Sequence, residues 1–384
     1  MLTGQNGILN RAAETKEKTE ESQKQENETL NEYEKTFNKY MSNLPSTEYT
    51  IPYLPDTNKF ERVDGTDLST GLVIREKATG SEYVWIEVPK TGEVYKNAGL
   101  NISEFSEENC IKIESDLHTY TNEYRNGTGY SDNYLKDDKN GWFKNSKEYN
   151  DAKYKMIKSV YENGGFWVGR YEAGTTNYIT KNENFSIIPV SKENMYPYIY
   201  VTRAQAEELA EKVESGNYTS SLMFGVQWDL MLKYIESKRS SVDSNIKDKL
   251  IDNSKTIGNF CDSSFTLDRG KYIQFTNFNL GKLWNEYNIN TTGYVENKYK
   301  KSMSEGNGIL MTTGASEMTK LQNIYDIAGN VWEWTLEQSA DFTPFCARRG
   351  GSYYSYANPY TASYRSCDET SYSFMHIGFR VSLY

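Results

Sequence analysis

The thiols and imidazoles are the side chains in this sequence best able to do chemistry, and they are few and widely spaced. The only two histidines, His118 and His376, lie far apart, which argues against a zinc or iron site built from histidines. The cysteines show no metal-ligand spacing; they could form one long-range disulfide, and buried free thiols are the other interpretation. The four cysteines are Cys110, Cys261, Cys346 and Cys367.

Carboxylates are the next candidates for chemistry, and none is paired by spacing as a general acid and base. The carboxylates that remain include Asp229, Asp326 and Glu333. Most carboxylates at the edge of the solvent have a structural role. We therefore interpret these three as structural.

The last 36 residues, 349–384, have a different character. They begin with Arg-Gly-Gly-Ser and end with Ile-Gly-Phe-Arg-Val-Ser-Leu, which alternates like a buried strand. The middle shows no helical or strand period, is crowded with Tyr and Ser, and contains no Lys. Tyr offers a large amphipathic contact surface at low entropic cost and Ser adapts its hydrogen bonds, a mixture typical of binding loops. The alternative is that Tyr is simply abundant in this chain, which has 32 copies.

The overall composition bounds the classes of function. A chain of 384 residues can hold one large domain or two to three ordinary ones. A formal net charge of -10 argues against nucleic-acid binding, because little would neutralise phosphates. No apolar run approaches the length of a membrane-spanning helix, and the start does not resemble a signal peptide.

Several segments predict the elements that position these residues. Residues 71–89 have the pattern of a β-hairpin, and residues 164–174 that of a glycine-bracketed strand. Thr202 and Gln205 form a capping-box pattern before an amphipathic helix, and residues 224–236 predict a second helix. Residues 237–305 carry few periodic signals, which predicts long loops.

The motifs GGFWVGRYEAG, SSLMFGVQWDLMLKYI, NIYDIAGNVWEWT, RRGGSY and IGFRVSL occur in this order. Together they resemble the formylglycine-generating-enzyme family, whose domains have a C-type-lectin fold. The resemblance runs from about residue 50 to 384 and implies an α+β, C-type-lectin-like fold of the formylglycine-generating-enzyme type, preceded by a long N-terminal helix. Gly329 permits a tight turn, Trp332 and Trp334 supply core area, and Arg349 and Arg380 could pin loops.

The resemblance also locates the catalytic positions of the family. Its enzymes use two cysteines, five residues apart, to hold copper. Alignment backwards from Gly378-Phe379-Arg380 without a gap puts these positions at Ala357 and Ala362. We therefore expect no enzymatic activity. The related iron-dependent sulfoxide synthases need three histidines, and the chain has two.

No cofactor is expected, apart from a structural calcium ion that the family analogy would place near Asn330 and Glu333. Calcium binds oxygen ligands of this kind, in a geometry that the loop sets.

The C-terminal segment also resembles the variable regions of proteins diversified by retroelements that mutate adenines, which lie at the end of this same fold. Between Tyr353 and His376 only Glu369 and Met375 fall outside the residues encoded by codons ending in C. We therefore predict a variable ligand-binding region in residues 349–384, in which Tyr364 and Arg365 are structural. The predicted ligand-binding residues are Tyr353, Tyr354, Ser355, Tyr356, Ala357, Asn358, Tyr360, Thr361, Ser366, Cys367, Asp368, Glu369, Tyr372, Phe374 and His376.

Residues 1–43 differ from the rest of the chain. From residue 11 to residue 40 they lack Gly and Pro and are rich in Glu and Lys, which predicts one long solvated helix; a disordered spacer is the alternative. The opening LTGQNGILNRAAETKEKTE resembles the stretch after the apolar N-terminal segment of type IV pilin-like proteins of Gram-positive bacteria. This implies that Met1 is an artificial start and that the membrane-embedded half is missing.

These observations predict a non-catalytic, adhesin-like variable protein displayed on the bacterial cell surface or pilus. The attachment would be through the missing apolar helix, and the partner a protein or surface ligand of another cell or a phage. A formylglycine-generating oxidase and a non-diversified structural pilus subunit are the two alternatives.

Overall fold

The computed structural model describes one of the two compact units of the chain. The units are Met1–Tyr49 and Thr50–Tyr384. The predicted helix at 1–43, with its pilin-like opening, lies outside the described residues. The structure describes residues 54–102, 104–125, 129–134, 143, 145–181, 186–276, 279–281, 283–286, 294–296, 308–339 and 345–384.

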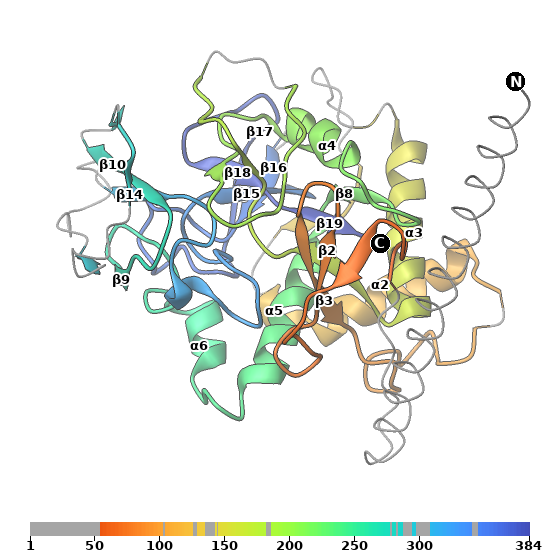
Figure 1. The fold of residues 1–384 in the computed structure, drawn as a ribbon. Coiled ribbons are helices and arrows are strands. Elements are labelled where there is room, and N and C mark those ends of the chain that lie inside the picture. The colour runs from red at the N-terminus through yellow and green to blue at the C-terminus, as the bar shows by residue number, and fades with distance from the viewer. Residues whose placement is uncertain are drawn as a thin grey trace, which may run out of the picture. The chain divides into compact units, whose positions relative to one another are not determined.

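A six-stranded antiparallel sheet organises one part of the unit (Figure 1), with the strand order β1-β2-β3-β5-β19-β8. The predicted hairpin is confirmed, since Val73 pairs with Val84 across β2 and β3. The predicted glycine-bracketed strand is also confirmed as β5. The bounds are β1 Phe60–Arg62, β2 Val73–Glu76, β3 Glu82–Glu87, β5 Gly165–Gly169, β8 Ser220–Leu222 and β19 Val381–Leu383.

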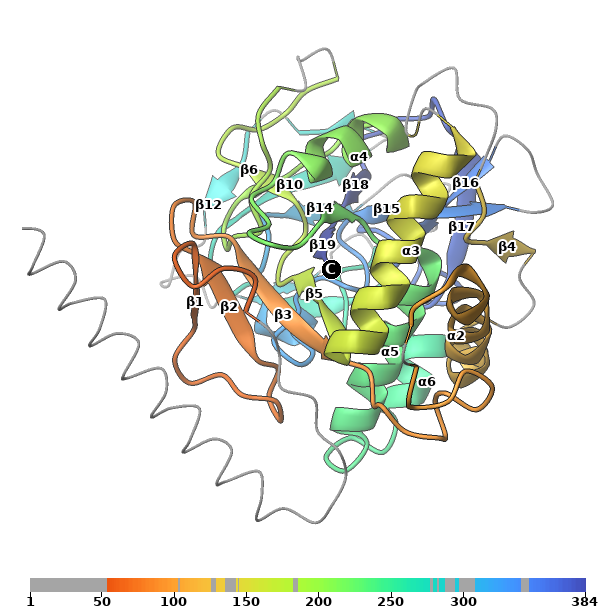
Figure 2. The same ribbon diagram turned by 90° about the vertical axis from the view of Figure 1, so that its right-hand side faces the viewer.

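Helices α2, α3 and α5 lie together on one side of the unit (Figure 2), where α2 contacts both α3 and α5. The predicted capping box is confirmed: Thr202 and Gln205 bond each other's main-chain N–H groups at the start of α4. The predicted second helix is α5. The bounds are α2 Glu107–Tyr120, α3 Ser146–Asn163, α4 Arg203–Glu211, α5 Gly225–Arg239 and α6 Ile246–Ile251, with 3₁₀ turns η1 Asn122–Tyr124 and η3 Glu317–Thr319.

A five-stranded sheet contains two strands of the C-terminal segment, β17 and β18. Its order is β17-β16-β15-β18, and β4 pairs with the far end of β15. β18 runs parallel to β15, whereas the other pairs are antiparallel. The bounds are β4 Tyr130–Ser131, β15 Trp332–Ser339, β16 Phe345–Arg349, β17 Arg365–Glu369 and β18 Ile377–Phe379.

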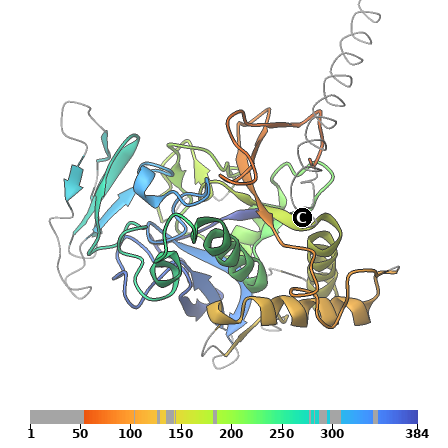
Figure 3. The ribbon, with the colours of Figure 1, turned by 90° about the horizontal axis from the view of Figure 1, so that it is seen from below.

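The middle of the chain holds more regular structure than the sequence predicted. Residues 237–305 include α6 and several short strands, of which β10 pairs with β14 over four residues. Figures 1 and 3 place β10 and β14 on the opposite side of the unit from α2. The bounds are β6 Gly174–Thr175, β7 Tyr196–Pro197, β9 Ser264–Thr266, β10 Lys271–Thr276, β11 Asn279–Leu280, β12 Asn285–Glu286, β13 Tyr294–Glu296 and β14 Gly308–Met311.

The predicted C-terminal strand is divided between the two large sheets. Ile377–Phe379 belongs to the sheet of β15, and Val381–Leu383 pairs with β5 and β8 in the other sheet. The buried Arg380 stands at the crossing. Its Nη2 lies 2.6 Å from Oε1 of Glu333, and the guanidinium also donates to the main-chain oxygens of Gly169 and Tyr325. One short stretch of chain therefore joins both sheets.

The core contains the large side chains that the sequence predicted for it. Trp332 and Trp334 are buried, and Nε1 of Trp334 donates to the carbonyl of Val201 at 3.0 Å. Gly329 has a φ of 73°, and a Cβ there would lie 2.1 Å from the carbonyl oxygen of Asn259, so only glycine fits this turn. Among the described residues, no helix combines the length and the apolar composition needed to cross a membrane.

Candidate ligand-binding site

The C-terminal segment starts at a turn that only glycines permit. Gly350 and Gly351 have φ angles of 87° and 78°, and a Cβ on Gly351 would lie 2.5 Å from Cε1 of Phe260. The chain then crosses residues 352–364 and returns as β17, whose Arg365 pairs with Arg349 at the end of β16. The start and the end of this excursion are therefore held side by side.

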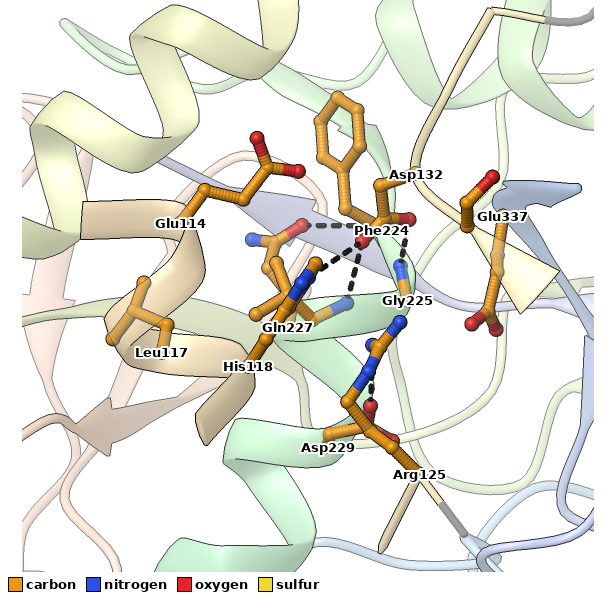
Figure 4. A network of polar contacts seen from close by, with 12 residues as sticks. Glu114, Leu117, His118, Arg125, Asp132, Phe224, Gly225, Gln227, Asp229 and Glu337 are labelled. Atoms are coloured by element: carbon orange, nitrogen blue, oxygen red, sulfur yellow. Dashed lines mark hydrogen bonds and ion pairs between the residues drawn. The ribbon is translucent and has the colours of Figure 1, made fainter. Parts of the chain in front are cut away.

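Buried ion pairs hold β17 to the scaffold. Nη2 of Arg365 lies 2.6 Å from Oδ1 of Asp229 on α5, and Nε lies 2.9 Å from Oε1 of Glu337 on β15. Arg349 reaches the same two carboxylates, at 2.9 and 3.4 Å. Arg125 adds a third guanidinium, 2.9 Å from Oδ2 of Asp229 (Figure 4). We call these five residues the arginine base.

The arginine base keeps its charges although it is shielded from water. Burial alone would lower the pKa of Arg365, but the charges of Asp229 and Glu337 raise it above its usual value. Burial, together with the neighbouring Arg365 charge, lowers the pKa of Arg349 to about 10. Both guanidinium groups are therefore charged at neutral pH. The expectation that Arg349 and Arg365 are structural is confirmed, as it is for Asp229.

Half-exposed rings follow one another along the outer surface of the segment. Tyr372 stacks on Phe374 with ring centroids 5.9 Å apart and planes at 8°. Phe374 contacts His376 at 4.9 Å, and Tyr354 lies 5.5 Å from His376 on the other side. The ring of Tyr354 also rests on Phe275 of β10 at 5.2 Å. This row of rings is continuous with the buried cluster under β10 and β14.

A second group of rings surrounds Trp332. Tyr360 and Tyr364 lie 5.0 Å apart, and Tyr360 meets Trp332 at 5.9 Å. Arg348 covers Trp332 from the other side, with Cζ 4.9 Å from the ring centroid, and lies 6.0 Å from the ring of Tyr372. Arg348 therefore connects the two groups of rings. We call Tyr354, Tyr356, Tyr360, Tyr372 and Phe374, all partly exposed, the aromatic face, and Tyr364, which was expected to be structural, supports it through Tyr360.

Polar atoms beside the aromatic face are not fully satisfied by the protein. Nη1 of Arg348 lies 2.7 Å from Oδ2 of Asp368, yet neither atom makes a well-aligned hydrogen bond within the described residues. Nε of Arg348 is likewise buried without a hydrogen-bond partner there. Burial lowers the pKa of Arg348 and raises that of Asp368. A ligand that supplied hydrogen bonds here would relieve an existing cost.

The predicted binding residues divide into inward and outward sets, and the surface position expected for five of them is wrong. Burial alternates after the Arg-Gly-Gly-Ser turn: Tyr353, Ser355 and Ala357 are buried, whereas Tyr354 and Tyr356 are half-exposed. The backbone here forms turns and no strand, and the N–H of Ser355 donates to the carbonyl of Ser352 at 2.9 Å. The buried five are Tyr353, Ser355, Ala357, Thr361 and His376, and the partly or fully exposed ten are Tyr354, Tyr356, Asn358, Tyr360, Ser366, Cys367, Asp368, Glu369, Tyr372 and Phe374.

Each buried member has a packing reason. Tyr353 lies against Phe275 at 5.4 Å, and its hydroxyl donates to the carbonyl of Met375 at 3.3 Å. The hydroxyl of Thr361 donates to the carbonyl of Ile251 at 3.1 Å. Burial lowers the pKa of His376 to about 3, so this imidazole is neutral.

The two positions that align with the catalytic cysteines lie close to one buried serine. Ser254 donates its N–H to the carbonyl of Ala357 at 3.3 Å, and its Oγ accepts from the N–H of Ala362 at 2.9 Å. Nε1 of Trp228 donates to the carbonyl of Ala362. Both methyl groups are fully buried in the core. These positions thus serve packing and main-chain hydrogen bonding in this chain.

The four thiols lie elsewhere and are not joined in disulfides. Burial raises the pKa of Cys346 to about 11 and those of Cys110 and Cys261 to about 12, so these three stay protonated at neutral pH. Cys367 is partly exposed on β17 and stands opposite Ala347.

The side chains that the family analogy associated with calcium are bonded to the protein. Oδ1 of Asn330 accepts from the N–H of Met311 at 3.1 Å, and its Nδ2 donates to Glu172 at 2.6 Å. Both oxygens of Glu333 face Arg380. A calcium ion at these residues would have to displace these partners, and the calcium site stays a prediction.

Sequence reasoning missed two residues that contact the aromatic face. Arg348 was read as part of a framing motif, although it lies between Trp332 and Tyr372. Phe275, which supports Tyr354, comes from a segment that was predicted to be loop. The two arginines before Gly-Gly could have indicated the role of Arg348. Adjacent residues of a strand face opposite sides, so only one of Arg348 and Arg349 can reach the buried carboxylates.

Comparison with known proteins supports the sequence-based fold. Residues 276–383 match the family model described as the sulfatase-modifying factor enzyme 1-like domain, which confirms the predicted resemblance for this part of the chain. The α+β prediction is also confirmed. No curated relative matches the sequence.

Two solved structures are similar to this chain at low TM-scores. One is described as the crystal structure of CarF, with 12% identity, a TM-score of 0.32, and coverage of 57% of this chain and 85% of that one. The other is Treponema denticola variable protein 1, with 14% identity, a TM-score of 0.30, and coverage of 57% of this chain and 84% of that one.

Proposed function

We propose that this chain is a ligand-binding protein whose aromatic face is the variable, partner-contacting surface. The observation that carries the proposal is the separation of two layers within one segment. The arginine base fixes β17 through buried carboxylates, and the half-exposed rings stand outside it. A surface of this kind can change its outer residues while its attachment stays the same.

The chemistry of the aromatic face suits protein or other surface ligands. Tyrosine rings bring large contact area with little loss of rotamer freedom, and hot spots of interfaces are enriched in Tyr, Trp and Arg. Arg348 and Asp368 add an ion pair beside the rings, with Nη1 and Oδ2 2.7 Å apart. The proposed partner is a component of another cell's surface or of a phage, met by a protein attached to a bacterial surface or pilus.

The test is selection of a ligand from such surface components, followed by alanine substitution of Tyr354, Tyr356 and Tyr372. Removing one of these anchors should weaken binding about thirtyfold, on the order of 2 kcal/mol, mainly through faster dissociation. Ser371→Ala, an exposed change in the same segment but outside the predicted binding residues, is the matched control. A ligand whose affinity ignores all three tyrosines would show that the binding surface lies elsewhere.

The diversification itself has a genomic test. The gene should lie near a reverse transcriptase gene and a near-copy of its 3′ end that differs at adenines. A 3′ end without such a copy would favour the alternative of a non-diversified pilus subunit.

A non-catalytic role is part of the proposal, since methyl groups occupy Ala357 and Ala362. The purified chain should bind no stoichiometric Cu(I) and should form no formylglycine in a cysteine-containing sulfatase peptide. Product above a no-protein control, detected by mass spectrometry, would restore the oxidase alternative.

A further inference from the structure

A group of potential metal ligands lies apart from the aromatic face, on helix α2. Glu114 and His118 are four residues apart, so they project from the same side of the helix, one turn from each other. Both line an open depression, and Figure 4 shows the two side chains. The other residues around it are Ile111, Ser115, Thr119, Asn122 and Arg125.

Asp132 brings a second carboxylate to these residues from the segment after β4. Its side chain is buried and fixes the start of α5: Oδ1 accepts from the N–H of Gly225 at 2.6 Å and Oδ2 from that of Val226 at 2.9 Å. Because these two hydrogen bonds hold the carboxylate rigidly, its remaining lone pairs point in a fixed direction. Figure 4 shows the His118 ring directed toward it.

The geometry leaves the imidazole nitrogen without a conventional partner. Nε2 of His118 lies 3.9 Å from Oδ2 of Asp132, which is beyond hydrogen-bond range. The atom is shielded from solvent and accepts or donates no hydrogen bond within the described residues. One ligand atom from each of Glu114, His118 and Asp132 lies within 4.8 Å of the others. An orphaned nitrogen facing two carboxylates calls for an explanation.

We propose that Glu114, His118 and Asp132 bind a divalent transition-metal ion of the zinc class. Zinc binds imidazole nitrogen and carboxylate oxygen at about 2.0–2.2 Å, so two ligands up to about 4 Å apart can share one ion. The pair of His118 and Asp132 meets this limit as it stands. Glu114 completes the site by a small rotation of its side chain, because it lies on the half-exposed wall of the depression. The imidazole disfavours calcium, which takes oxygen ligands.

Lys153 is the competing cation at this place. Its ammonium donates to Oε1 of Glu114 at 3.0 Å and to the main-chain oxygen of Asp132 at 2.8 Å. It balances one of the two carboxylate charges and uses one oxygen of Glu114. The neighbouring Arg125 is already paired with Asp229. One negative charge therefore remains for the metal ion to neutralise.

The site would connect three elements that support the C-terminal sheet. α2 supplies Glu114 and His118, the segment after β4 supplies Asp132, and Asp132 caps α5. β4 in turn pairs with β15, and the hydroxyl of Tyr130 donates to the carbonyl of Arg365 at 3.3 Å. A bound ion would thus stabilise the edge of the sheet that carries the aromatic face, without touching that face. The proposal does not depend on the proposed binding function.

The sequence-based argument against a histidine site concerned sites built from several histidines. It did not consider a site with one histidine and two carboxylates. Glu114 and His118 have a readable i, i+4 spacing, but Asp132 is brought to them only by the fold.

The experiment is titration of the whole, chelator-stripped chain with zinc chloride by calorimetry, with cobalt(II) absorption as a report on coordination. We expect one zinc ion per chain. His118→Gln and Glu114→Gln should each weaken zinc binding by at least about tenfold. Calcium chloride should produce no comparable heat.

Two control variants separate this site from adventitious binding. Glu107→Gln removes an exposed charge from the first turn of α2, and Cys110→Ser removes a buried thiol one turn before Glu114. Both should bind zinc like the unchanged chain. Melting curves of the metal-free variants show whether each folds; if His118→Gln does not, Glu114→Gln decides, since Glu114 is only half-buried. Absence of stoichiometric zinc binding, binding indifferent to both substitutions, or binding lost with Cys110 would overturn the proposal.

Discussion

The arginine base and the aromatic face belong to the same segment but are held by different kinds of contact. The base depends on residues distant in the chain, since Arg365 meets Asp229 on α5 and Glu337 on β15. Many contacts of the face are made within the segment, as between Tyr372 and Phe374. A substitution in the aromatic face should therefore disturb mainly the segment itself, whereas a substitution in the arginine base should also disturb α5 and β15.

The largest effect should come from removing the shared carboxylate of the base. Asp229→Asn removes the carboxylate that pairs with all three arginines of the base and leaves the buried Arg349 and Arg365 with Glu337 alone. It should lower the free energy of unfolding by about 3–5 kcal/mol. Arg365→Met should cost less, because two arginines and two carboxylates remain in balance. Urea unfolding of both variants measures the difference. A smaller loss for Asp229→Asn than for Arg365→Met would contradict this account of the base.

Two adjacent tyrosines give the sharpest contrast between inside and outside. Tyr353→Ala empties a fully buried site and should lower the free energy of unfolding by about 3–5 kcal/mol. Tyr354→Ala removes a half-exposed ring and should cost no more than about 1 kcal/mol while weakening ligand binding. Denaturant titration of the two variants tests this ranking, and equal losses would mean that the face is part of the core.

A change of pH should alter the stability of the scaffold and leave the aromatic face unchanged. Burial raises the pKa of Glu207 on α4 to about 8, although the N–H of Leu222 bonds its Oε2 at 2.8 Å. The group is neutral in the folded chain and ionised in the unfolded chain between about pH 4.5 and pH 8, so its contribution to stability is complete below that range and falls as pH rises through it.

Glu207→Gln should therefore be more stable than the unchanged chain at pH 8, by at least about 1 kcal/mol, and the gain should shrink toward pH 5. Melting temperatures at the two pH values check this. An equal difference at both values would show that Glu207 ionises alike in the folded and unfolded chain.

The smallest effect should come from the exposed tips of the segment. Asn358, Glu369 and Ser371 are exposed, and replacing all three by alanine should change the free energy of unfolding by no more than about 0.5 kcal/mol for each. A cooperative loss of several kcal/mol, seen in the same denaturant assay, would mean that the outer layer also supports the fold.

Much of the fold could be predicted because its signals are local. The hairpin at 71–89 shows in alternation, and the capping box of α4 in Thr202 and Gln205. For the candidate binding site, the sequence predicted the segment but not which of its residues face outward. Whether Tyr353 or Tyr354 faces outward depends on the turn at Gly350 and Gly351 and on Phe275, which arrives from β10. The partners of Arg349 and Arg365 likewise lie far away in sequence.

Because the C-terminal stretch crosses from one sheet to the other, the domain can fold only when residues 349–384 are complete. β19 follows residues 349–376 in the chain and pairs with both β5 and β8. A chain that is cut short or shifted in reading frame within residues 349–376 lacks this strand, so β5 and β8 keep open edges that favour aggregation. If the segment is diversified as proposed, truncated products would lack β19 and would not fold, so only full-length variants would present a binding surface.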